Sequence, residues 1–362
     1  MTDKQQNSEP DQMRPISASE AKTLVEDLFD LRPTIYWVDF LFSATITYGG
    51  VALYLTAPIY SALQIAAFLV AGIALFRIST FMHEIVHIRK NHMKVFKLVW
   101  NCFAGIPLLT PSLFYTTHAD HHSNRYYGTA ADGEYLPFRV TGPSRILGFI
   151  ATIPLLPILA TARALVLVPL SLVFPPLRRW LLARASAAVI SHAHQRRNVP
   201  NIWSPVWLAA DLGGFVYAAS IMFLTIRGTI ALETLGMLYL LIVYAIGLNW
   251  LRTLAAHRYG NSGREVSHSD QVLDSINITG NPILTELIFP VGLRYHALHH
   301  LLPSLPYHAL PRAHARLMEA LPADSSYRST NCPNAVIAIR QLWRDANMCQ
   351  DSAAAMKLWR QG

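Results

Sequence analysis

Four long apolar segments constrain this chain more than any other feature. They cover residues 35–55, 61–81, 203–226 and 234–254. Each has about the 20 residues that an α-helix needs to cross a bilayer. Because backbone N–H and C=O groups must be paired inside lipid, such segments fold as helices. Short connections at residues 56–60 and 227–233 join them in pairs, so the sequence predicts two transmembrane helical hairpins.

Composition agrees with a membrane protein. Charged residues make up 14% of the chain and hydrophobic residues 52%, whereas soluble domains contain roughly 25% charged residues. The net charge of +8 does not indicate nucleic-acid binding, because the basic residues flank the apolar segments. The three cysteines form no CxxC motif, which argues against a disulfide framework and thiolate metal sites. The first 30 residues are polar, so we expect no cleavable signal peptide.

Histidine is concentrated in three motifs: His83-Glu-Ile-Val-His87, His118-Ala-Asp-His121-His122 and His296-Ala-Leu-His299-His300. Spacings of three or four residues place the imidazoles on one face of a helix. Eight imidazoles are too many for one zinc ion, which takes four ligands. Nitrogen ligation at open sites favours redox-active iron, although imidazole also suits copper and zinc. We therefore predict that these eight histidines bind two metal ions, with His257 after the fourth apolar segment as a ninth ligand.

Residues 96–113 and 146–174 are also apolar, but we expect neither stretch to cross the bilayer. The second is long enough, yet prolines at 154, 157 and 169 interrupt it and Arg163 lies in its middle. If the histidines at the ends of the second and fourth segments share a site with those after the first extra stretch, all lie on one side of the membrane. Each extra stretch must then return to the side it left, which predicts interfacial or re-entrant helices.

The distribution of basic residues predicts how the chain is oriented in the membrane. One residue, Arg227, is basic in the two short loops opposite the histidines. The histidine side carries ten basic residues, namely Arg89, Lys90, Lys94, Lys97, Arg125, Arg178, Arg179, Arg184, Arg196 and Arg197. Cytoplasmic loops carry the excess of Lys and Arg. The histidine side is therefore predicted to be cytoplasmic, at the inner membrane if the chain is bacterial.

The predicted fold class is an all-α integral membrane protein with four transmembrane helices, interfacial helices and a cytoplasmic helical cap that holds the histidines. Residues 1–33 are predicted to form a polar cytoplasmic arm with a short amphipathic helix near residues 18–31. Residues 34–320 form the membrane domain, and residues 321–362 a cytoplasmic tail.

Two other metal sites fit part of the pattern. His83-Glu84-x-x-His87 matches the HExxH motif of zinc proteases, with Glu84 as general base. Such a protease needs one more ligand, and Asp211 is the only acidic residue well inside a predicted span. This interpretation leaves both HxxHH motifs unused. A carboxylate di-iron site needs two Glu-x-x-His pairs on helices, but its second pair, Glu265 and His268, lies in a sequence typical of a loop.

Six other histidines are predicted to face the surface or the lipid headgroups. They lie outside the three motifs, in basic, glycine-containing or proline-containing segments: His92, His192, His194, His268, His308 and His314.

The sequence around the motifs resembles the integral-membrane fatty acid desaturase family, which also includes hydroxylases and ketolases. The resemblance covers residues 35–320 and rests on the HxxxH, HxxHH, HxxHH order. Residues 118–128, 132–135 and 294–307 are similar to bacterial members, and residues 252–259 resemble the family segment with an extra histidine ligand. In the best-known acyl-CoA desaturases an asparagine four residues before that histidine orders a metal-bound water. Thr253 stands there in this chain, and the first motif is one residue shorter, so a different branch is indicated.

The resemblance implies a non-haem centre of two iron ions with O2 as co-substrate, and no catalytic side chain separate from the metal site. Its chemistry is the removal of hydrogen from unactivated lipid carbons, for which no amino-acid side chain is a strong enough oxidant. We expect a desaturase of fatty acid biosynthesis that introduces a double bond into a fatty acyl chain. A lipid or carotenoid hydroxylase or ketolase with the same centre is the alternative.

Further expectations concern the surroundings of the metals. Glu84, Asp120 and Asp274 are predicted to accept N–H bonds from ligating imidazoles, with Thr253 beside them. The chain has no haem-binding motif, no CxxC and no GxGxxG after a strand. Electrons are therefore expected from an external ferredoxin-like or cytochrome carrier that docks on the basic face. The other predicted partners are the fatty acyl substrate and membrane lipids.

Overall fold

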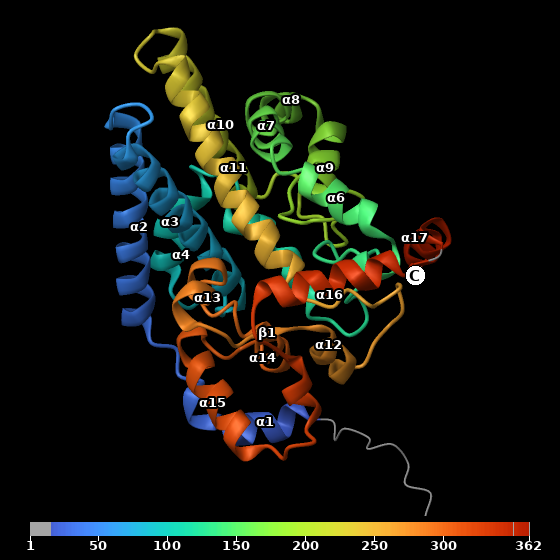
Figure 1. Cartoon of the computed structure of the whole chain (residues 1–362). Helices are drawn as coiled ribbons and strands as arrows, with labels where there is room; N and C mark the ends of the chain where they lie inside the picture. Colours follow the sequence, from blue (N-terminus) through green and yellow to red (C-terminus); the bar gives the residue numbers. More distant parts are fainter. Residues whose placement is uncertain (1–15, 350, 362) are drawn as a thin grey trace, which may run out of the picture.

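The computed structural model describes residues 16–349 and 351–361. Residues 1–15 of the predicted arm lie outside this range. Helices dominate the described residues (Figure 1). The predicted all-α membrane class is confirmed.

Four long helices correspond to the four predicted spans: α2 (Pro33–Thr56), α3 (Ala62–His87), α10 (Pro205–Ile226) and α11 (Leu232–Leu254). Each is long and apolar enough to cross a membrane. Pro33 and Pro205 begin their helices, where the missing N–H has no helical partner to lose. Ser61 caps α3 by accepting a hydrogen bond from the Gln64 N–H. Both connecting loops lie at the end of the molecule farthest from the cap (Figure 1).

The two pairs of long helices pack differently. α2 packs along α3, and α11 packs mainly against α3 as well. Gly72 allows this close approach, because a Cβ there would lie 2.1 Å from the Tyr244 ring of α11. α10 packs instead against a helical segment that follows the second motif. The α10–α11 pair is thus opened rather than closed into a tight hairpin.

That segment consists of α7 (Leu155–Ala162), the π-helical η5 (Arg163–Leu167) and α8 (Val168–Val173). It forms a fifth stretch long and apolar enough to cross a membrane. Pro157 falls in the first turn of α7, where amide groups have no helical partner, and the π-helical turn η5 precedes Pro169, so neither proline breaks the segment. In Figure 1 the segment is seen nearly end-on, whereas α2 and α10 are seen along their lengths. The number of crossings remains a prediction.

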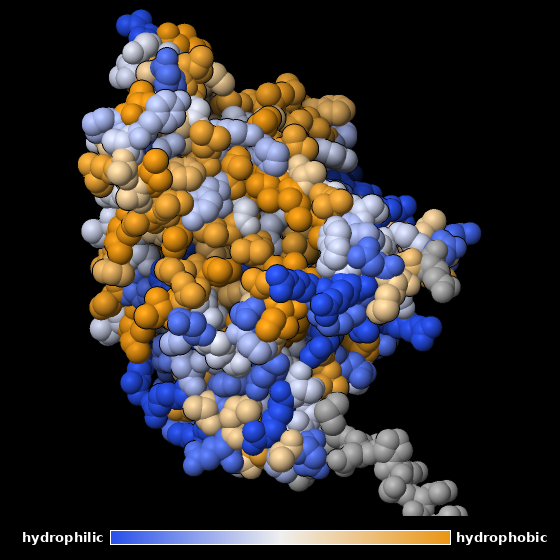
Figure 2. Space-filling model, in the orientation of Figure 1, coloured by the Kyte–Doolittle hydropathy of each residue, from blue (hydrophilic) through white to orange (hydrophobic). Residues whose placement is uncertain are grey.

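The outer surface has two halves. Hydrophobic residues cover much of the half built from the long helices, and hydrophilic residues dominate the cap (Figure 2). Val38 and Phe42 of α2 are each 63% exposed. A contiguous apolar surface of this kind requires lipid around it.

The remaining elements are short and build the cap and its borders. The α-helices are α1 (Ala18–Leu24), α4 (Lys94–Trp100), α5 (His118–His121), α6 (Pro143–Ala151), α9 (Pro175–Arg184), α12 (His268–Asp274), α13 (Pro282–Ile288), α14 (His296–Leu301), α15 (Leu310–Ala320), α16 (Ala335–Asn347) and α17 (Ser352–Gln361). The 3-10 helices are η1 (Glu26–Leu28), η3 (Ser112–Thr117), η4 (Phe138–Val140), η6 (Tyr307–Ala309) and η7 (Ser326–Thr330), and η2 (Asn101–Gly105) is a π-helix. Strands β1 (Asn277–Ile278) and β2 (Asn331–Cys332) pair in parallel, Asn277 with Asn331.

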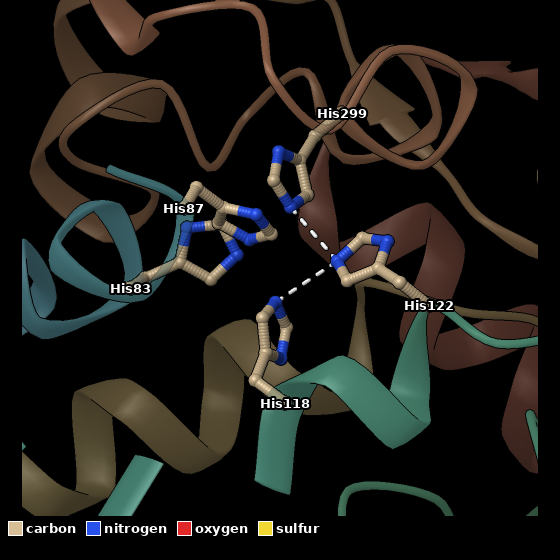
Figure 3. Close-up of side chains that lie close together, drawn as sticks. All are labelled: His83, His87, His118, His122 and His299. Atoms are coloured by element: carbon tan, nitrogen blue, oxygen red, sulfur yellow. Dashed lines mark hydrogen bonds between the residues drawn. The ribbon is translucent and has the colours of Figure 1, made fainter. Parts of the chain in front are cut away.

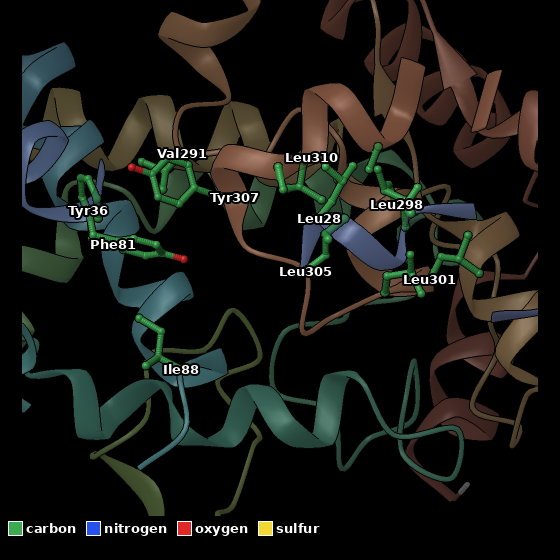
Figure 4. Packing of buried hydrophobic residues seen from close by; sticks show 14 of the residues in the cluster. Leu28, Tyr36, Phe81, Ile88, Val291, Leu298, Leu301, Leu305, Tyr307 and Leu310 are labelled. Atoms are coloured by element: carbon green, nitrogen blue, oxygen red, sulfur yellow. The ribbon is translucent and has the colours of Figure 1, made fainter. Parts of the chain in front are cut away.

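One apolar core fixes the cap against the first pair of long helices (Figure 4). It joins Leu28 of η1, Tyr36 of α2 and Phe81 of α3 to Leu298 of α14 and Leu310 of α15. Each fully buried large side chain of this kind contributes about 1.5–3 kcal/mol. The core therefore holds the end of α3, with the first histidine motif, beside the third motif.

The residues after 320, predicted as a tail, pack onto the rest of the protein. β2 pairs with β1, and α16 packs against α11 and η4. In α17, the Trp359 indole N–H donates to the Gly128 carbonyl at 2.8 Å. The domain boundary that we placed after residue 320 remains a prediction.

Candidate metal centre

Four separate segments bring histidines to one place. The last turn of α3 carries the first motif, and the short α5 carries the second. α14 carries the third motif, and His257 follows the end of α11. An isolated bridge between His257 and Ser275 holds that residue beside the end of α12. All nine predicted ligands therefore meet where the cap contacts the ends of α3 and α11.

The nine imidazoles form two groups. The first contains His83, His87, His118, His122 and His299, whose ring nitrogens point toward one another (Figure 3). The second contains His121, His257, His296 and His300. In each group one nitrogen per residue lies within 4.8 Å of the others. Each HxxHH motif contributes to both groups, because adjacent residues on a helix point in different directions.

Hydrogen bonds around the second group define which nitrogens carry lone pairs. His121 Nδ1 lies 2.8 Å from Asp132 Oδ2, so it donates its proton there. The Tyr127 hydroxyl donates to Asp274 Oδ2 at 2.7 Å, so its oxygen accepts from His257 Nδ1 at 2.9 Å. The Nε2 atoms of His121 and His257 then both carry lone pairs, yet they lie 3.2 Å apart. Two facing lone pairs repel unless a cation binds both, so this arrangement fits a metal ion.

The first group also brings ring nitrogens close together. His118 Nδ1 donates to Glu134 Oε1 at 2.8 Å, which leaves its Nε2 lone pair facing His122 Nε2 at 2.9 Å. Both ring nitrogens of His83 and the Nε2 atom of His87 are buried without a partner among the described residues. Leaving buried polar atoms unpaired costs roughly 1–3 kcal/mol each. Metal ligation would satisfy them.

Two acidic residues that we did not predict orient the second motif. Asp132 and Glu134 accept the Nδ1 protons of His121 and His118, as above, and the Tyr115 hydroxyl donates to Glu134 Oε2 at 2.5 Å. Such carboxylates fix the imidazole tautomer and raise its basicity toward a metal. One sequence signal was available, since these are the only charged residues between positions 126 and 138.

Burial controls the protonation of the site. It lowers the pKa of His118, His257, His296 and His300 well below the usual histidine value, and neighbouring imidazoles add to the effect. His121 differs: burial lowers its pKa, but the carboxylates of Asp132 and Glu134 together raise it overall. Burial also raises the pKa of Asp274 and brings that of Glu134 to about 7. Neutral imidazoles with free lone pairs are the form that binds metal.

Three of the four residues that we predicted to surround the metals lie near the imidazoles without a direct hydrogen bond to them. Glu84 accepts from the Tyr36 hydroxyl at 2.7 Å, and its nearest ligand atom, His83 Nδ1, is 3.8 Å away. Asp274 reaches His257 only through Tyr127. Thr253 is buried one turn before His257.

Asp120 points elsewhere. It pairs with Arg197 at 2.8 Å, and that guanidinium lies 3.4 Å from the centre of the Tyr126 ring. Our expectation that it accepts from an imidazole is not met by this arrangement. Its position in the motif, between the predicted ligands His118 and His121, turns it toward the surface.

The six remaining histidines stay outside both groups. His92 and His192 are exposed, as expected. His268, His308 and His314 are half-buried with hydrogen-bond partners. The prediction that His194 faces the surface is wrong, since this residue is only 2% exposed. The fold turns its ring inward against Gly133.

Asp211 does not join the HExxH motif. Its carboxylate binds Arg163 at 2.7 Å and Arg178 at 2.5 Å in a buried triad. Arg178 is thus an internal counter-ion and does not contribute to the surface charge that we assigned to it. With Asp211 occupied and both HxxHH motifs beside the first, the zinc protease loses its third ligand.

Comparison with known proteins agrees with this geometry. The sequence matches the family model described as fatty acid desaturase over residues 60–331. The chain belongs to the fatty acid desaturase family. It is also 37% identical over 326 residues to a ceramide hydroxylase from Caulobacter vibrioides (strain NA1000 / CB15N), covering 90% of this chain and 92% of that protein. No solved structure matches the chain.

Membership of the desaturase family confirms the predicted resemblance. It makes the protein a membrane oxidoreductase of the lipid desaturase and hydroxylase group. The family works at a di-iron centre, and the two histidine groups supply nitrogen donors for two ions.

Proposed function

We propose that this protein is an O2-dependent lipid hydroxylase that acts on a ceramide-type membrane lipid. The observation that carries the proposal is the similarity to a ceramide hydroxylase along nearly the whole of both chains. Thr253 and the short first motif, both departures from the acyl-CoA desaturases, support the same choice. This proposal replaces the desaturase that we expected from the sequence.

The five histidines of the first group would hold one iron and the four of the second group the other. Iron in such a site activates O2, and the net reaction is R–H + O2 + 2e⁻ + 2H⁺ → R–OH + H2O. The chain's own contribution is to hold the nitrogen donors in place. Asp132 and Glu134 orient two of them, and Tyr127 orients His257.

The two electrons require an external carrier, as the sequence predicted. His87 and His122 are the ligands that are only half-buried. Exposed Arg89 and Arg125 follow them closely in the chain. We propose that an acidic ferredoxin-like or cytochrome carrier docks here, on the face that we place in the cytoplasm, because opposite charges steer such encounters.

Desaturation is the second candidate, and the match to the family model favours it. Its net reaction, R–CH2–CH2–R′ + O2 + 2e⁻ + 2H⁺ → R–CH=CH–R′ + 2H2O, uses the same centre and the same carrier.

Lipid mass spectrometry separates the two candidates. The protein is expressed in a host that makes ceramide and lacks the activity, with iron and an electron donor supplied. A ceramide that gains one oxygen atom supports hydroxylation, and a lipid that loses two hydrogens supports desaturation. His300→Ala should abolish either product, whereas His92→Ala, at an exposed position outside both groups, should not. No new lipid from the wild-type protein would contradict both candidates.

A further inference from the structure

A cavity of about 780 Å³ lies outside the two histidine groups, between α6, residues 190–193 and the C-terminal α17. Figure 1 shows α17 beside α6 at the edge of the molecule. Known ligand sites have volumes of roughly 300–1,000 Å³. The size of this cavity therefore suits the head of a lipid.

One part of the cavity is cationic. Arg145 and Arg360 line it together with His192, and no aspartate or glutamate is among its lining residues. Among the described residues neither guanidinium forms an ion pair with a carboxylate, unlike those of Arg139 and Arg197. Unpaired guanidinium groups that face one cavity favour an anion, and the planar donor array of arginine matches phosphate in particular.

Apolar side chains line the cavity as well. Phe138, Phe149 and Met356 line it, and all three are buried. The hydroxyl groups of Ser144 and Ser191 lie among the lining residues as well. A cavity with cationic and apolar parts fits an amphiphile better than a free inorganic ion.

The cavity also borders the lipid-facing surface. α6 exposes Leu147 and Ile150, which are 56% and 41% accessible. The chain then continues almost directly into α7, which exposes Leu155 and Ile158. A lipid whose tails lie along this apolar surface can place its head in the cavity.

We propose that this cavity binds the head of an anionic phospholipid, with the phosphate on Arg145 and Arg360 and the first carbons of the tails on Phe138 and Phe149. The site is separate from the metal centre, and the proposal does not depend on which lipid is oxidised.

A lipid bound here would tie α17 to the metal-binding cap. Trp359 lines the cavity and donates to the Gly128 carbonyl. The Gly128 N–H donates to Asp132 Oδ2 at 3.0 Å, and that carboxylate holds His121. Binding should therefore stabilise the folded cap, since a ligand that binds only the native state raises its stability.

The test is the thermal unfolding midpoint of the full-length protein in detergent. Phosphatidylglycerol should raise the midpoint by several degrees in a saturable manner, and phosphatidylcholine with the same acyl chains should not. The double variant Arg145→Gln/Arg360→Gln should lose this shift. The matched control Arg340→Gln/Arg344→Gln, on the exposed face of α16 and outside the cavity, should keep it.

Gly148→Phe tests the cavity without removing a charge. A Cβ at this helical position meets no atom within 4 Å, so the ring can enter the cavity. This variant should fold, because glycine inside a helix is unfavourable, and should lose the phosphatidylglycerol shift. An equal shift in both the cavity variants and the control would overturn the proposal. So would an equal shift with inorganic phosphate alone, which would make this a site for a soluble anion.

Discussion

Asp132 Oδ2 accepts the Nδ1 proton of His121 at 2.8 Å, and both side chains are buried. The same carboxylate accepts the backbone N–H groups of Gly128 and Glu134 at 3.0 and 2.9 Å. One acid therefore closes the turn after the second histidine motif and sets the tautomer of a predicted metal ligand in that motif. The two tasks are coupled, because one carboxylate makes all three contacts.

Asp132→Asn should weaken metal binding by about 10- to 100-fold, the usual effect of losing a partner of a ligating histidine. The amide is a poorer acceptor and leaves His121 less basic. Iron per chain, measured after dialysis against graded chelator, checks the prediction. Asp120→Asn is the matched control, since Asp120 contacts Arg197 and no imidazole. Equal iron retention in both variants would show that the contact has no role in binding.

Because the histidines form two separate groups, we predict that each group binds its own metal ion. His118→Ala removes a nitrogen from the first group, and His296→Ala removes one from the second. Each variant should retain about one iron per chain or less and lose lipid product by at least 100-fold, because both ions serve one reaction. Elemental analysis together with lipid profiling measures this. Two full equivalents of iron in either variant would contradict the assignment of that histidine.

Asp211→Asn should destabilise the protein by about 3–5 kcal/mol. The change leaves Arg163 and Arg178 without their shared counter-ion, and an uncompensated buried charge is costly. The thermal unfolding midpoint should fall, while the folded fraction keeps its iron. Glu233→Gln, at an exposed helix start, provides the control. Loss of iron with unchanged stability would instead restore Asp211 as a ligand.

The burial of His314 predicts that the protein becomes less stable as the pH falls. Burial, helped by the positive charge of Arg294, lowers the pKa of His314 from 6.5 to about 4. Between these values the unfolded chain binds a proton that the folded chain does not, so acid favours unfolding. Lowering the pH from 7 to 5 should cost roughly 1–2 kcal/mol through this residue. His314→Gln should therefore show a smaller fall in the unfolding midpoint over this range than wild type. Above pH 7 the two proteins should respond alike, and parallel curves at all pH values would refute the assignment.

Local sequence determined the helices and the chemistry of the site. Apolar runs of sufficient length have few alternatives to a helix in lipid, so α2, α10 and α11 begin and end close to the predicted limits. α3 begins as predicted but continues past residue 81 to His87, through the first histidine motif. The spacing within each histidine motif likewise selects one face of a helix. Both signals lie within a single helical segment and need no knowledge of distant residues.

Contacts between residues far apart in the sequence could not be predicted from these local patterns. Asp132 and Glu134 were missed because their partners lie 11 and 16 positions earlier across a turn, where no helical period applies. His194 looked like a surface residue in a basic loop, and only the packing of that loop on Gly133 buries it. The role of Asp211 depended on Arg163 and Arg178, which approach it from other helices.

The sequence by itself determined that this is a helical membrane protein with nine histidines available for metal. Only the tertiary structure decided how these histidines divide into groups of five and four, which acids orient them, and that α17 closes a cavity beside α6. The physical reason is that periodicity and hydropathy are local properties of the chain. Pairing of charges, tautomers and cavities depends on side chains that folding brings together from far apart.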